Sequence, residues 1–213
     1  MDKVIIYVLL FICFIWLYRK YANRQKSAYI DDYDFHKGLI LKFKSQRPEL
    51  SDEKISVVAL ALKDYFKICQ MAKSDFVSMP SQVVDELWHE FILFTRHYQR
   101  FCKSAFGRYL HHTPAEAMMQ PNLASDGLKR AWKYACRLEG LDPSSPARLP
   151  RLFALDAMYQ IENGFYYSKD CKKNNGTGYC ASDIGCSGHS GCAGSSDNTS
   201  SCGSSCGSGC GGD

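Results

Sequence analysis

The sequence lacks several patterns that would assign a function directly. None of its 11 cysteines forms a C-x2-C pair, so the commonest spacing of a zinc finger is absent. No long basic stripe is interleaved with stacking aromatics, and the formal net charge is only +4. A nucleic-acid-binding protein usually has both a basic stripe with stacking aromatics and a strongly positive charge. We therefore expect no nucleic-acid partner.

Two motif matches fail in their context. His89 and Glu90 begin like a zincin motif, but that motif needs a second histidine four residues after the first, and Leu93 stands there. The segment 203–207 fits the G-x-S-x-G elbow of hydrolases, which needs a strand before it and a helix after it. The surrounding Gly/Ser-rich sequence supports neither element. Neither a metalloprotease nor a serine hydrolase is indicated.

The first twenty residues hold the longest apolar run. Val4–Tyr18 contains fifteen residues without a charge. A helix of this length rises about 22 Å, against a bilayer core of about 30 Å, and Lys3, Arg19 and Lys20 can extend its reach by snorkelling. We expect a transmembrane anchor over 1–20. The alternatives are a cleaved signal peptide, for which no A-x-A site is present, and a buried core helix.

Basic residues around this run predict the orientation of the chain. One lysine precedes the run, and four basic residues follow it closely: Arg19, Lys20, Arg24 and Lys26. Because basic residues are retained on the cytoplasmic side, we expect a single-pass membrane protein with its body facing the cytoplasm. Membrane lipid is an expected partner, and the basic flank can also contact anionic lipid. The favoured interpretation of these charges, however, is that they only set the topology.

The rest of the chain divides by composition. After a basic juxtamembrane linker over 21–28, aromatic and apolar residues are frequent over 29–168, which predicts one compact helical domain. Over 169–213 glycine, serine and cysteine dominate, with seven cysteines. Such a segment cannot bury enough surface to offset its ordering entropy, so we expect a disordered tail. The predicted fold class is mainly α.

Apolar periodicity and capping residues predict the helices of the domain. Ser51 is an expected N-cap, Met79-Pro80-Ser81 is a second helix-entry signal, and Gly107 is an expected C-terminal stop. The segment Leu152–Leu155 fits a short helix or a buried strand. The expected helices are Ile30–Gln46, Ser51–Lys73, Gln82–Phe106 as one continuous helix, and Asp126–Glu139 capped by Ser125.

Polar and aromatic side chains of the longest helix and the loop after it form the candidate functional cluster. Its members are Asp85, Trp88, His89, His97, Tyr98, Cys102, His111 and His112. One continuous helix puts Asp85, His89 and His97 on the same stripe. From Phe91 to Phe106 it rises about 24 Å, whereas five extended residues return only about 17 Å. A contact between His89 and His112 is therefore strained, and His97 is the expected neighbour of the loop.

Three interpretations of this cluster stay open. The histidines can be structural and hydrogen-bonded, can bind a divalent metal together with Asp85, or can act in acid/base catalysis without a metal. Cys102 lies in the apolar stripe, which is typical of a small buried hydrophobe. No catalytic residue, cofactor or metal is assigned beyond a possible divalent ion.

The segments VDELWHEFILFTRHYQRFC and FGRYLHHTP resemble the glycine-rich domain-containing protein-like family. The matching residues are Trp88, His89, Tyr98, Cys102, His112 and Pro114. The resemblance covers Tyr33–Tyr166, with its specific core at Met79–Pro114, and suggests a short membrane-anchored bacterial-type member. It implies a helical domain and no established enzymatic activity.

These observations predict a membrane-tethered helical interaction module with a protein partner and no catalysis of its own. The alternative is a divalent-metal-binding protein, or a metal-dependent enzyme, that uses the region of His89, His97, His111 and His112. An interaction module should expose an apolar patch, whereas a metal site should show converging imidazoles.

Overall fold

The computed structural model describes residues 2–112, 121–168 and 179–180. Within these ranges the chain is mainly helical, which confirms the predicted fold class. The helices are α1 (Asp2–Asp32), α2 (Lys37–Gln46), α3 (Asp52–Ala72), α4 (Gln82–Leu93), α5 (Thr95–Phe106), α6 (Pro121–Leu138) and α7 (Arg151–Tyr159). Two short parallel strands, β1 (Tyr167–Ser168) and β2 (Tyr179–Cys180), pair near the end of the described chain. Except for β2, the predicted disordered tail lies outside the described residues, as does Pro114.

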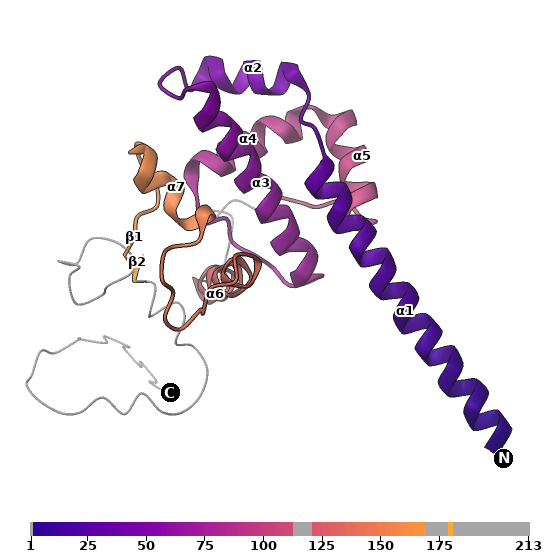
Figure 1. The fold of residues 1–213 in the computed structure, drawn as a ribbon. Coiled ribbons are helices and arrows are strands. Elements are labelled where there is room, and N and C mark those ends of the chain that lie inside the picture. Colours follow the sequence, from indigo (N-terminus) through magenta and orange to yellow (C-terminus); the bar gives the residue numbers. More distant parts are fainter. Residues whose placement is uncertain (1, 113–120, 169–178, 181–213) are drawn as a thin grey trace, which may run out of the picture.

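Helix α1 extends from the body as one long rod (Figure 1). Its segment Lys3–Asp32 is long and apolar enough to cross a membrane, and none of the apolar window is buried in the structure. A signal sequence meets the same criterion. The residues 21–28, expected as a linker, continue the same helix, and Lys26 donates a hydrogen bond to the Phe106 carbonyl at 3.2 Å. The helix is therefore joined directly to the domain.

Helix α3 lies at the centre of the domain and packs against α1, α4, α6 and α7. Ser51 caps its first turn by accepting a hydrogen bond from the Lys54 amide, as the sequence predicts. Phe66 is fully buried on α3, and its ring contacts Trp88, Phe91 and Phe101. This aromatic cluster forms the core between α3, α4 and α5.

The helix expected over Gln82–Phe106 is two helices, because the chain breaks at Phe94 with φ −79° and ψ 57°. The core explains the break. Phe91 and Phe101 are ten residues apart and would lie about 15 Å apart along a straight helix. In the structure their ring centroids lie 5.4 Å apart. The break lets both rings pack into the same core.

Three other predicted elements differ in their bounds. The segment expected as one helix over Ile30–Gln46 contains the end of α1 and all of α2, separated by a short turn before Lys37. At that turn the ring Nδ1 of His36 accepts a hydrogen bond from the Gly38 amide at 3.1 Å and caps α2. Helix α6 begins at Pro121, so Ser125 lies inside it and is no N-cap. The undecided segment Leu152–Leu155 is helical, within α7.

Candidate metal centre

The start of α4 is fixed by a buried carboxylate. Asp156 of α7 is 1% exposed and accepts hydrogen bonds from the Ser81 hydroxyl and from the backbone amides of Gln82, Val83 and Phe165, at 2.7 to 3.3 Å. A helix N-terminus carries unsatisfied amides and a partial positive charge, which a carboxylate stabilises. Asp156 thus holds α4 in place against α7.

A buried chain of hydrogen bonds ties α4 and α5 to the loop that follows them. The Trp88 indole N–H donates to the Tyr98 hydroxyl at 3.1 Å, and that hydroxyl donates to the Leu110 carbonyl at 2.6 Å. Burial raises the pKa of Tyr98 far above its usual value, so the phenol keeps the proton that it donates. The loop is therefore anchored at Leu110, two residues before His112.

The loop itself turns back toward α4. Gly107 ends α5 in the left-handed conformation with φ 75°, which glycine adopts without strain. Arg108 donates a hydrogen bond to the Lys73 carbonyl at the end of α3, and the Leu110 side chain is buried. With both ends of the turn held, His112 lies over the exposed side of α4.

Asp85, His89 and His112 meet at this point. Asp85 and His89 are one helical turn apart on α4, and their nearest side-chain atoms, Oδ2 and Nε2, lie 3.6 Å apart. The His112 Nε2 lies 2.8 Å from the other Asp85 oxygen, and the ring centroids of His89 and His112 are 4.4 Å apart. Trp88 packs edge-on against His112, also at 4.4 Å, and restrains its ring.

One potential ligand atom from each of these residues lies within 4.8 Å of the other two. Two imidazoles and one carboxylate form a donor set for zinc and for other divalent transition metals. Exposure is 19% for the Asp85 side chain, 11% for His112 and 49% for His89. One side of the group is therefore open to solvent, which would leave coordination positions for water or another ligand.

Comparison with known families places this geometry in context. The family model UCP032817-like matches residues 25–184, most of the chain and all of this cluster. The chain belongs to the UCP032817-like family. The expected resemblance to the glycine-rich domain-containing protein-like family is wrong, because the matching family model is a different one. No curated protein and no solved structure matches the chain.

In this UCP032817-like domain, His97 and His111 do not belong to the group formed by Asp85, His89 and His112. His97 lies on α5 beside His36, with ring centroids 5.0 Å apart, and His111 packs against Tyr109 at 4.8 Å. Two predictions are therefore wrong: that His97 is the neighbour of the loop, and that a contact between His89 and His112 is strained. Both assumed a straight helix, and the break at Phe94 shortens the return path of the loop.

Three other predicted site residues lie in the buried core: Trp88, Tyr98 and Cys102. Burial raises the pKa of the Cys102 thiol, so it stays protonated at neutral pH, and a protonated thiol is a poor nucleophile. These three residues therefore position the loop and α4. They do not present reactive atoms at the surface.

Sequence reasoning missed two contributors to the site. Asp156 lies in an apolar helix of a different part of the chain, and a lone aspartate among Leu155, Ala157 and Met158 is a signal for a buried, paired carboxylate. The Leu110 carbonyl also holds the loop, and a backbone acceptor leaves no mark in the sequence.

Proposed function

We propose that this protein is a membrane-tethered helical module that binds one divalent transition-metal ion through Asp85, His89 and His112. The convergence of these three side chains carries the proposal. Two of them come from one face of α4, and the third arrives on a loop that the Trp88–Tyr98–Leu110 hydrogen bonds hold in place. Ligands restrained in this way reduce the entropy cost of metal binding.

The interaction-module hypothesis has less support. Large apolar side chains of the domain that are exposed come from separate segments: Leu41, Leu60, Leu93, Tyr109, Met158 and Tyr166. Exposed apolar residues are normal on a protein surface and do not by themselves indicate a partner. Converging imidazoles are the feature that distinguishes the metal hypothesis, so we favour it. We assign no reaction to the site.

Calorimetric titration with zinc tests the proposal. Full-length protein in a non-ionic detergent is stripped with a chelator, and its reactive thiols are alkylated so that cysteines do not compete. We expect one zinc ion per chain and a loss of more than about 100-fold in affinity for His112→Ala, because losing a ligand exceeds the roughly 10- to 100-fold cost of losing an outer-shell partner.

His111→Ala is the matched control, since His111 is adjacent in sequence but packs against Tyr109. It should bind zinc like the wild type. Equal losses in the two variants, or a wild-type protein that takes up no zinc after alkylation, would rule out the site.

A further inference from the structure

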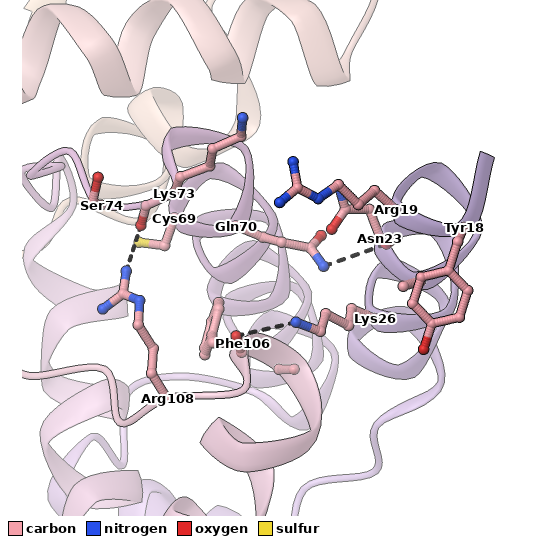
Figure 2. A pocket seen from close by; sticks show the side chains of 12 residues that line it. Tyr18, Arg19, Asn23, Lys26, Cys69, Gln70, Lys73, Ser74, Phe106 and Arg108 are labelled. Carbon is pink, nitrogen blue, oxygen red and sulfur yellow. Dashed lines mark hydrogen bonds between the residues drawn. The ribbon is translucent and has the colours of Figure 1, made fainter. Parts of the chain in front are cut away.

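A pocket of about 570 Å³ lies where α1 meets the domain. Its walls come from α1, from the C-terminal ends of α3 and α5, and from the start of the loop after α5. Figure 2 shows Arg19 and Lys26 extending from α1 toward side chains of α3 and α5. The pocket is distinct from the metal centre, because none of the three proposed ligands lines it.

Four cationic side chains line this pocket, and none of its lining residues within the described ranges is an aspartate or glutamate. Two of them hold its walls together: Lys26 donates to the Phe106 carbonyl, and Arg108 donates to the Lys73 carbonyl (Figure 2). The side chains of Arg19 and Lys73 form no hydrogen bond or ion pair with any residue in the described part of the chain. Arg19 and Lys73 are therefore available to bind an anion from outside the protein.

The position of the pocket along α1 points to the source of this anion. Tyr18 is the last residue of the apolar run and also lines the pocket, and Arg19 is the first charged residue after it. Tyrosine and basic residues gather where a membrane helix leaves the hydrocarbon core. If α1 crosses a bilayer, the pocket opens at the depth of the lipid headgroups.

We infer that this pocket binds a phosphate group, supplied by the headgroup of an anionic lipid, between Arg19 and Lys73. Guanidinium and ammonium groups are the usual protein partners of phosphate oxygens. The inference rests on the proposed membrane anchoring by α1 and is independent of the metal. Bound lipid would link α1 to the end of α3 and so fix the domain against the membrane surface.

Native mass spectrometry of the full-length protein in detergent tests this inference. The probes are dioctanoyl phosphatidic acid, dioctanoyl phosphatidylcholine and inorganic phosphate, and the intact mass verifies that α1 is retained. We expect one tightly bound phosphatidic acid per chain and weaker binding of phosphatidylcholine. The double variant Arg19→Gln, Lys73→Gln should bind phosphatidic acid roughly 10- to 30-fold more weakly, as expected for losing two basic contacts.

The matched control is Arg24→Gln, Lys103→Gln, which removes the same charge from exposed positions of α1 and α5 that do not line the pocket. It should bind like the wild type. Binding of inorganic phosphate that depends on Arg19 and Lys73 would keep the phosphate site but assign it to a free anion. Equal binding by the pocket variant and the wild type, or an equal loss in the control, would overturn the inference. Because the short-chain probes need no bilayer, failure of the anchoring proposal would not produce either result.

Discussion

At the scale of single residues, Asp156 fixes the start of the helix that carries Asp85 and His89. Its carboxylate accepts hydrogen bonds from the Ser81 hydroxyl and two backbone amides at the start of α4, and from the Phe165 amide after α7. Hydrogen bonds to a charged group each contribute about 1.5–3 kcal/mol, and an unsatisfied buried donor costs about 1–3 kcal/mol. The geometry of the metal centre therefore depends on a residue far from it in sequence.

We predict that Asp156→Asn lowers the free energy of unfolding by about 3 kcal/mol, because the amide presents donors where the structure needs acceptors. Urea denaturation followed by circular dichroism measures the change. Glu162→Gln is the control, as it removes one negative charge from a nearby exposed position and should change stability by less than about 0.5 kcal/mol. Similar losses in both variants would contradict the capping role.

The Tyr98 hydroxyl contributes both to the stability of the domain and to the position of the loop that carries His112. Its hydroxyl is the only link between Trp88 and the Leu110 carbonyl among the hydrogen bonds of the described residues. Tyr98→Phe should destabilise the domain by about 1–3 kcal/mol, since it leaves a buried donor and a buried acceptor without partners. It should also weaken zinc binding, because the loop that carries His112 loses its anchor.

Tyr109→Phe is the comparison for Tyr98→Phe. Tyr109 lies on the same loop with its ring against Tyr98, but it is 41% exposed. Denaturation midpoints and zinc titrations of this variant should match the wild type. If Tyr98→Phe left zinc affinity unchanged while destabilising the fold, the loop anchor would have no role at the site.

At the scale of elements, the break between α4 and α5 decides which residues meet. A straight helix would carry Tyr98 about 15 Å along the axis from Trp88, yet the two side chains are hydrogen-bonded. The break turns α5 back against α4 and brings Phe101 against Phe66 of α3, and the loop after α5 then reaches Asp85. The candidate site exists because this helix is interrupted.

Proline substitution tests the break. Thr95 is the first residue of α5, where proline is tolerated, and Phe94 has already left the helical region that a following proline disfavours. Thr95→Pro should cost less than about 1 kcal/mol, whereas Arg100→Pro within α5 should cost about 3 kcal/mol or more. Both positions are exposed, so denaturation midpoints compare the backbones directly. Equal losses would indicate a continuous helix in solution.

The helices that carry their own signals could be predicted from the sequence, and the break could not. Ser51 and Ser81 act as N-caps, and Gly107 ends α5 as expected, because capping depends on local chemistry. No proline or glycine marks Phe94. The break is imposed by packing of Phe91, Tyr98 and Phe101 against distant residues, and such tertiary effects override local preference.

The sequence predicts which residues form the candidate site but not how they are arranged, because the arrangement also depends on tertiary contacts. Asp85 and His89 share a helix face that the spacing alone defines. His112 joins them only through the break and through the anchored loop, both of which depend on tertiary contacts. The expected proximity of His97 to that loop followed from a straight helix and failed with it.

At the scale of the whole molecule, the long apolar helix α1 joins the compact domain directly, without an intervening flexible segment (Figure 1). The hydrogen bonds of Lys26 and Gln70 across this junction fix the direction in which the rod leaves the domain. A membrane that received the rod would therefore also orient the phosphate pocket and the metal centre.

Our proposal for the membrane is a single-pass anchor with the domain in the cytoplasm, based on the basic residues that follow the apolar run. A reporter at the C-terminus that fluoresces only in the cytosol should be active, and sodium carbonate should not extract the protein. An intact mass that lacks the apolar run would identify a cleaved signal sequence. An active reporter on a carbonate-soluble protein would contradict the anchor.

The most direct test of the metal centre is X-ray absorption at the zinc edge of the alkylated, full-length protein loaded with one equivalent of zinc. Our account predicts nitrogen and oxygen ligands at about 2.0–2.2 Å with the scattering pattern of two imidazoles, and no sulfur at about 2.3 Å. His112→Ala should lose the signal of one imidazole or fail to retain zinc. A sulfur-dominated spectrum, or an imidazole signal that persists unchanged in His112→Ala, would contradict a metal site at Asp85, His89 and His112.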